Sequence, residues 1–176
     1  MSLLRFLGIG GTSKGRESEP VSLTEIGAQL ETLPPEQARF VAAFAYLLAR
    51  IAAADLRTDA TERDSIAHRM ETFAEIDHDL AGILADTAIR AAADHDASDD
   101  HLVARAFRDM TEQPERIRLI RCLYAVAAAD EEISTVEDNE IYEVAKAIGI
   151  SHSDVISLRL EFKKYLGALK AHPSER

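Results

Sequence analysis

The sequence is short of the residues that interrupt helices or cross-link a chain. It has 8 Gly and 5 Pro among 176 residues, no Trp, and a single cysteine, Cys122. One cysteine cannot form an internal disulfide or a thiolate zinc cluster, which fits a reducing compartment. Cys122 lies among Leu119, Ile120, Leu123 and Val126, so we expect it to be a small buried hydrophobe.

Basic side chains and long apolar runs are also scarce. The chain has 20 Lys and Arg against 31 Asp and Glu, a formal net charge of -11. This charge repels phosphate backbones and argues against a nucleic-acid partner. The longest apolar run, Phe40–Ala49, is about half of the roughly twenty residues that a transmembrane helix needs. Residues 1–9 lack the features of a secretory signal, so we expect a cytoplasmic protein without a transmembrane segment.

Two regions differ in composition. Residues 1–20 are predicted to be a flexible tail, because residues 8–20 are rich in Gly, Ser and charge. Residues 21–172 are predicted to form one helical domain. A short apolar patch in the tail gives at most weak membrane contact. Its members are Leu3, Leu4, Phe6, Leu7 and Ile9.

Apolar residues recur at spacings of three and four, as in Phe40, Phe44, Leu47 and Ile51, with no sustained alternation. The predicted fold class is therefore all-α, a compact bundle of about 7–8 helices. Proline and capping-box signals place the helix starts. The predicted helices are 22–32, 35–55, 60–74, 77–95, 99–111, 114–130, 135–147 and 152–169.

An offset of about 75 residues aligns the chain with itself. Ala52–Asp55 then matches Ala127–Asp130, and Glu62 matches Glu137. Each copy is an apolar helix that ends in Ala-Ala-Ala-Asp, a short loop, and a second helix opened by a capping signal. The two predicted helix–loop–helix hairpins cover residues 35–74 and 114–147.

This duplicated pattern resembles the TerB-like (tellurite resistance protein B-like) family over roughly residues 35–170. The resemblance implies an all-helical fold, no established catalytic reaction, and a role in cation binding and stress-related protein assemblies. The chain has Leu56 and Glu131 where the family often has Gly after the Asp. Because Gly permits backbone angles that Leu and Glu resist, the fine loop geometry cannot be carried over.

Four duplicated carboxylates are the candidate metal ligands: Asp55, Glu62, Asp130 and Glu137. An Asp at a helix C-terminus faces the negative end of the helix dipole, so either loop amides or a bound cation should compensate for it. In one interpretation the glutamates cap the following helices. In the other, the carboxylates of one elbow, or of both together, hold calcium or magnesium with loop carbonyls and water.

Three other clusters carry metal-ligand residue types. The run Asp94–His101 and the triplet Asp77–Asp79 are predicted to be interhelical loops whose acidic residues suit helix N-termini. Glu75 and His78 have the Glu-x-x-His spacing of a di-iron bundle. That fold needs the motif twice and the sequence has it once, near a predicted helix boundary.

The functional hypothesis that follows is a non-enzymatic TerB-like module with unidentified protein partners and acidic elbows that bind divalent cations. One alternative is an interaction or dimerisation domain without metal, including a homodimer. The other is an unrecognised enzyme such as a helical-bundle metalloenzyme. No phosphate-binding loop, nucleophile elbow or zinc-protease helix motif occurs.

Overall fold

The computed structural model describes residues 30–31, 33–54, 60–94 and 100–167, which form helices and no strand. The one trace of β structure among them is an isolated bridge between Ile133 and Leu166. The predicted all-α class is therefore confirmed. The predicted tail 1–20 and nearly all of the predicted helix 22–32 lie outside the described residues.

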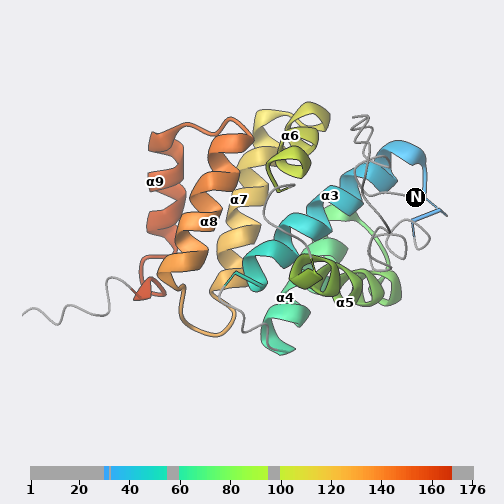
Figure 1. Ribbon diagram of the computed structural model, residues 1–176, viewed down its shortest axis with the longest axis horizontal. Coiled ribbons are helices and arrows are strands. Elements are labelled where there is room, and N and C mark those ends of the chain that lie inside the picture. The colour runs from blue at the N-terminus through green and yellow to red at the C-terminus, as the bar shows by residue number, and fades with distance from the viewer. Residues whose placement is uncertain (1–29, 32, 55–59, 95–99, 168–176) are drawn as a thin grey trace, which may run out of the picture.

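Seven helices are described, and they are labelled α3 to α9 in Figure 1. Their bounds are α3 Pro35–Ala52, α4 Ala60–Ala74, α5 His78–Asp94, α6 Asp100–Met110, α7 Gln113–Ala127, α8 Thr135–Ala147 and α9 His152–Glu161. None of the described helices is long and apolar enough to cross a membrane.

Helix α3 forms the centre of the molecule. It is buried on nearly all sides from Val41 to Ala49, as expected for a helix that is apolar all round. It packs against α4, α5, α6, α7 and α8, and it crosses the middle of the view in Figure 1. The aromatic rings of Phe40, Phe44 and Phe107 stack at this core, with centroids 5.5–6.5 Å apart.

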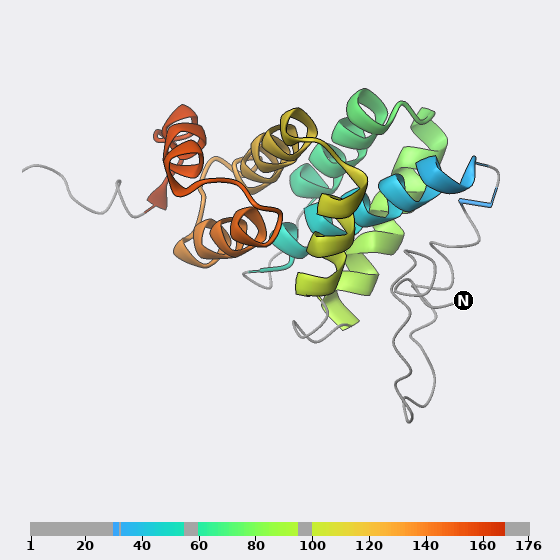
Figure 2. The same ribbon diagram turned by 90° about the horizontal axis from the view of Figure 1, so that it is seen from above.

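The remaining helices lie around α3 in two groups. Helices α4 and α5 pack on each other and on α3, whereas α7, α8 and α9 lie side by side at the other end of the molecule. Helix α6 lies between these groups and contacts both α3 and α8 (Figure 2). Its apolar face carries Val103, Ala104 and Phe107, which are all buried.

Two networks of hydrogen bonds and ion pairs join neighbouring helices. The Tyr46 hydroxyl donates a hydrogen bond of 2.7 Å to Asp100 Oδ1, and Arg50 Nε lies 2.8 Å from Asp100 Oδ2. These contacts join α3 to the first turn of α6. In the second network Asp138 of α8 accepts hydrogen bonds from Tyr124 of α7 and Arg159 of α9. Burial and the Asp138 carboxylate raise the pKa of Tyr124 well above its usual range.

Several helix ends differ from the prediction. Helices α3 and α7 end at Ala52 and Ala127, three residues before the predicted ends at 55 and 130. The predicted helix 152–169 is too long, because α9 ends at Glu161. The Phe162 ring then stacks on Tyr124, at 5.4 Å between centroids, and the chain turns back toward the loop before α8. Tertiary contacts therefore stop this helix where no Gly or Pro does.

Candidate functional site

The two predicted elbows begin with the same local geometry. The Ala53 amide donates to Ala49 O at 3.0 Å, and the Ala128 amide donates to Tyr124 O at 3.0 Å. The next amide in each copy, that of Ala54 or Ala129, also bonds back into its helix. Helices α4 and α8 begin exactly 75 residues apart, at Ala60 and Thr135. The repeat is thus visible at the described ends of both elbows, while superposition of the whole hairpins stays a prediction.

The α7–α8 elbow comprises residues 128–134 and presents three consecutive exposed carboxylates. They belong to Asp130, Glu131 and Glu132. Asp130 Oδ1 accepts a hydrogen bond of 3.1 Å from the Glu132 amide. Asp130 thus lies three residues beyond the end of α7, and a loop amide binds its carboxylate, one of the two arrangements expected from the sequence.

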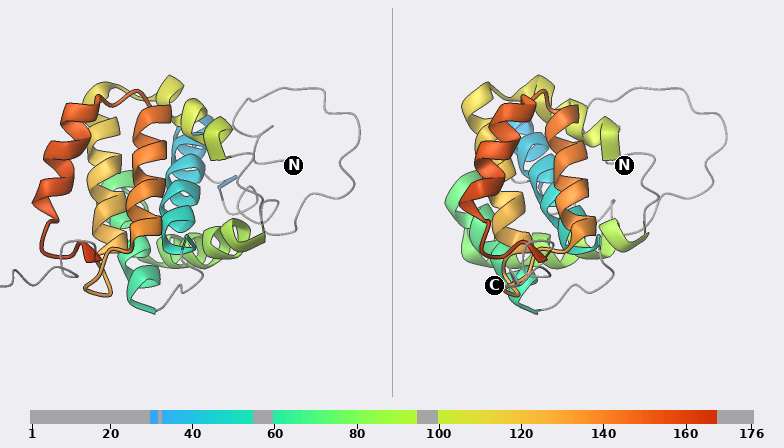
Figure 3. Two further views of the ribbon diagram at one scale, coloured as in Figure 1. Left: turned by 60° about the vertical axis from the view of Figure 1, so that its left-hand side comes forward. Right: turned by 90° about the vertical axis from the view of Figure 1, so that its left-hand side faces the viewer.

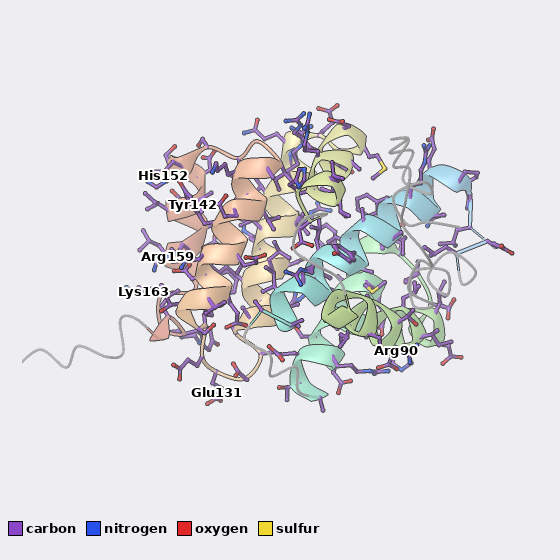
Figure 4. The ribbon with its side chains drawn as sticks, viewed as in Figure 1. Arg90, Glu131, Tyr142, His152, Arg159 and Lys163 are labelled. Carbon is purple, nitrogen blue, oxygen red and sulfur yellow. The ribbon has the colours of Figure 1, made fainter. Side chains whose placement is uncertain are left out.

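Glu131 has a backbone conformation that its residue type resists. Its φ is 72°, in the left-handed region, which costs an L-residue about 1–2 kcal/mol. The elbow thus has a left-handed residue directly after the Asp, the position where the family often has Gly. Figure 4 shows Glu131 at the tip of the elbow, away from the body of the molecule.

The base of the elbow is anchored to the chain beyond α9. The Ile133 amide donates to Tyr165 O at 2.7 Å, and the Gly167 amide donates to Ile133 O at 3.0 Å. The Ile133 side chain is buried in the core. The elbow is therefore anchored at Ile133, on the C-terminal side of the strained Glu131.

Glu137 caps α8, as one of the two interpretations predicted. Its Oε2 accepts a hydrogen bond of 2.8 Å from the Ser134 amide, and Ser134 Oγ accepts one of 3.2 Å from the Glu137 amide. This reciprocal pair is a capping box. The Glu137 side chain is buried, and one of its carboxylate oxygens is committed to the helix end.

The α3–α4 elbow is described only in part. Glu62 lies in the first turn of α4 and is buried. Asp55 lies outside the described residues, so its position relative to Glu62, Asp130 and Glu137 is untested. The four-carboxylate metal site therefore stays a prediction.

The described residues do not make a cation cage by themselves. Across the described ranges, no three His, Cys, Asp or Glu side chains converge as metal ligands. Calcium takes six to eight oxygens, whereas Asp130 and Glu137 each have one oxygen engaged with the backbone. A cation at this elbow would need Asp55, the neighbouring acids or several waters to complete its coordination.

Among the described residues, the other candidates make contacts at helix ends and on the surface. Glu75 and His78 flank the break between α4 and α5, where Glu75 has a φ of 53°, so they do not share one helix face. His78 Nδ1 lies 2.7 Å from Glu71 Oε1 on the surface, and this pairing raises the pKa of His78. Asp77 Oδ1 accepts the Leu80 amide at 2.9 Å, which caps α5. Of the Asp94–His101 run, residues 95–99 lie outside the described residues.

Cys122 is buried, as predicted, and burial raises the pKa of its thiol to about 11. A groove between α6 and α8, by contrast, had no counterpart in the sequence analysis. Its lining includes Asp100, Ala104 and Glu143. Local sequence gives no signal for it, because the two helices meet only through tertiary packing.

Comparison with known proteins agrees with this geometry. The family model described as "Tellurite resistance protein TerB" matches residues 40–160. That range runs from α3 through the α7–α8 elbow to α9, so it includes both helix pairs. No curated protein and no solved structure matches the chain.

Proposed function

The chain belongs to the TerB family, and from this premise we propose that it is a non-enzymatic module that works by binding, with the α7–α8 elbow as its binding surface. We place it in the cytoplasm, within a stress-related protein assembly of the tellurite-resistance type.

The observation that carries the proposal is the backbone of Glu131 together with the exposed acids on either side of it, a combination that Glu75, the other described non-glycine residue with positive φ, lacks. A glycine would adopt a φ of 72° without steric cost, yet the chain has a charged residue there, between two more exposed acids. Strained residues persist where the surrounding structure holds them, and they cluster at binding and switch sites. We infer that the carboxylate at this tip is retained for the contact that it makes.

The buried polar residues support a binding role rather than catalysis. Within the described residues they are Glu62, Thr87, Thr111 and Glu137. Thr87 and Thr111 donate to the carbonyls of Ile83 and Phe107 in their own helices. Glu137 caps α8. A role in the fold thus accounts for Thr87, Thr111 and Glu137.

The ligand that we propose for the elbow is a hard divalent cation, calcium or magnesium. Asp130 Oδ2 and the exposed carboxylates of Glu131 and Glu132 are oxygen donors of the right class. Asp55, Glu62 and Glu137 are the further ligands that the repeat predicts. Water would complete the coordination sphere, since these groups supply few oxygens in this geometry.

Calorimetric titration of the chelator-stripped full chain with calcium and with magnesium tests this proposal. We expect binding heat and a higher melting temperature, with about 2.7 kcal/mol of added stability at a cation concentration of 100 times Kd. The double variant Asp55→Asn/Asp130→Asn should lose both responses. Glu143→Gln, which removes an exposed acid of α8 outside the elbow, is the matched control and should keep them.

The outcomes are distinct. No heat with either cation, or an equal response in wild type and the double Asn variant, would refute a cation at the elbows. Loss of the response in Glu143→Gln as well would show only general charge attraction.

The alternative function is dimerisation without metal. Three apolar side chains are exposed at the outer edge of α8 and α9: Tyr142 at 38%, Ile156 at 45% and Leu160 at 57%. Figure 4 shows Tyr142 at this edge beside His152, and their rings meet edge to face at 5.7 Å. Sedimentation at increasing concentration should then show a dimer that Leu160→Ser dissociates, and a monomer throughout would exclude this contact.

A further inference from the structure

A second surface, separate from the elbow, has the form of a docking groove. It lies between the first turns of α6 and the second half of α8, with a volume of about 330 Å³. Small apolar side chains line its floor, namely Ala104 of α6 with Val144 and Ala147 of α8. Figure 3 shows α6 and α8 next to each other at this side of the molecule.

The rim of this α6–α8 groove is mainly acidic. Asp100, Glu140 and Glu143 line it, together with His101 and with Lys146 as the one Lys or Arg. Asp100 is neutralised by Arg50 at 2.8 Å, whereas Glu140 lies at a longer 3.6 Å from Arg50. The rim therefore attracts positive charge mainly through Glu140 and Glu143.

Glu143 can exchange its present partner. It pairs with Lys146 at 3.1 Å, but the two side chains are 62% and 68% exposed. An exposed pair of this kind contributes little, since solvent screens it. A cation that arrives with its own apolar contact can replace Lys146 at little cost.

A stripe on one face of α8 leads from the groove toward the elbow. Val136 is 52% exposed, and its spacing of four, seven and eleven residues from Glu140, Glu143 and Ala147 keeps all four on one face. This stripe spans about three turns, roughly 16 Å. Helix α8 as a whole has four carboxylates and one Lys, so its formal charge is −3.

We propose that the α6–α8 groove docks a basic amphipathic helix of a protein partner. Apolar side chains of that helix would lie on Ala104, Val144 and Ala147. Its Lys or Arg side chains would extend along the groove so that their charged ends pair with Glu140 and Glu143. A second copy of this chain fits less well, because each copy has a net charge of -11. The proposal rests on a binding role for the protein but not on the elbow.

A labelled synthetic peptide of about 18 residues, or five helical turns, with Leu on one face and Lys on the other, is the probe. Fluorescence anisotropy is measured with the full chain in EDTA at low salt, so no cation at the elbow contributes. We expect saturable binding that weakens as salt is raised. A peptide with Glu in place of each Lys should not bind.

Two matched pairs of variants locate the site. Glu143→Lys should weaken binding by about fivefold to tenfold, whereas Asp109→Lys should change it by less than about twofold, although the Asp109 side chain is also exposed, at 69%. Val136→Ser should weaken binding, and Ile83→Ser on α5, with a similar 45% exposure, should not. All four positions are exposed, so these variants should fold.

Equal affinity of wild type and Glu143→Lys, or equal losses in Glu143→Lys and Asp109→Lys, would overturn the assignment of the groove. Loss of peptide binding in the variant Glu131→Gln/Glu132→Gln would also overturn it, because the peptide would then bind at the elbow. Failure of the cation titration leaves this test intact, because it is done in chelator. Binding that produces a dimer of the chain would assign the groove to a second copy and overturn the proposal.

Discussion

Replacement of Glu131 by glycine should stabilise the protein, although glycine usually destabilises a fold. The φ of 72° at this position costs a non-glycine residue about 1–2 kcal/mol. Glycine removes that cost, but it also raises the entropy of the unfolded chain, which lowers the free energy of unfolding by about 0.4–1 kcal/mol. The net expectation is a gain of roughly 0.5–1 kcal/mol in the free energy of unfolding.

The reference for this measurement is Glu131→Ala rather than the wild type. Alanine removes the carboxylate and any contact that it makes, but keeps the strained backbone. The difference between the Gly and Ala variants therefore isolates the backbone term. Urea unfolding should give the Gly variant the higher midpoint with an unchanged slope, and its melting temperature should rise by about 1–4 °C over the Ala variant.

Gly149 provides the reverse substitution. It has a φ of 80° after α8, where the Ile150 amide donates to Ala145 O at 2.9 Å in a Schellman motif. A Cβ there would meet Arg108 at an ordinary 3.7 Å, so Gly149→Ala should lose about 1 kcal/mol for backbone reasons alone. If Glu131→Gly were no more stable than Glu131→Ala while Gly149→Ala lost stability, the reasoning about strain at Glu131 would be refuted.

Three further predictions follow from other contacts. Ser134→Ala and Glu137→Ala each break the capping box, so urea unfolding should show a loss of about 0.5–2 kcal/mol, and unchanged midpoints would contradict it. The hydrogen bond to Glu71 raises the pKa of His78. The His78–Glu71 pair therefore stabilises the fold fully below the ordinary histidine pKa, and this stabilisation is lost as the pH rises through the raised pKa. NMR titration should therefore give His78 a pKa above about 6.5 that falls in Glu71→Gln, and no fall would exclude the pairing. Burial raises the pKa of Cys122 to about 11, so at about pH 8 a disulfide reagent should label it only after denaturation; rapid labelling of the native protein would contradict its burial.

Much of the local structure of this protein is set by local sequence. Pro35 and Ser151 start helices where the sequence places them, because proline fits the first helical turn and the Ser151 side chain accepts the Asp154 amide at 3.2 Å. The capping box at Ser134 and Glu137 could be predicted from the sequence for the same reason. Signals of this kind act within three or four residues, so a sequence contains them completely.

The ends of the helices were less predictable. The apolar pattern of the last helix continues to Leu166, yet α9 ends at Glu161, because Phe162 packs on Tyr124 of α7 and Leu166 pairs with Ile133. These contacts join residues more than thirty positions apart. No local pattern reports them, so the prediction was wrong there.

The candidate sites likewise combine features that local sequence sets with features that tertiary packing sets. The sequence by itself determined that Glu137 caps α8, because a capping box is local, whereas Asp130, which was expected at the end of α7, lies in the elbow three residues beyond that end. Only the tertiary structure decided that Glu131 takes a left-handed conformation, since Ile133, fixed to the chain beyond α9, holds the base of the elbow. It alone placed Ala104 beside Val144 to form the α6–α8 groove. The physical reason is that hydrogen bonds at a helix end span a few residues, whereas a groove exists only after the core has brought distant helices together.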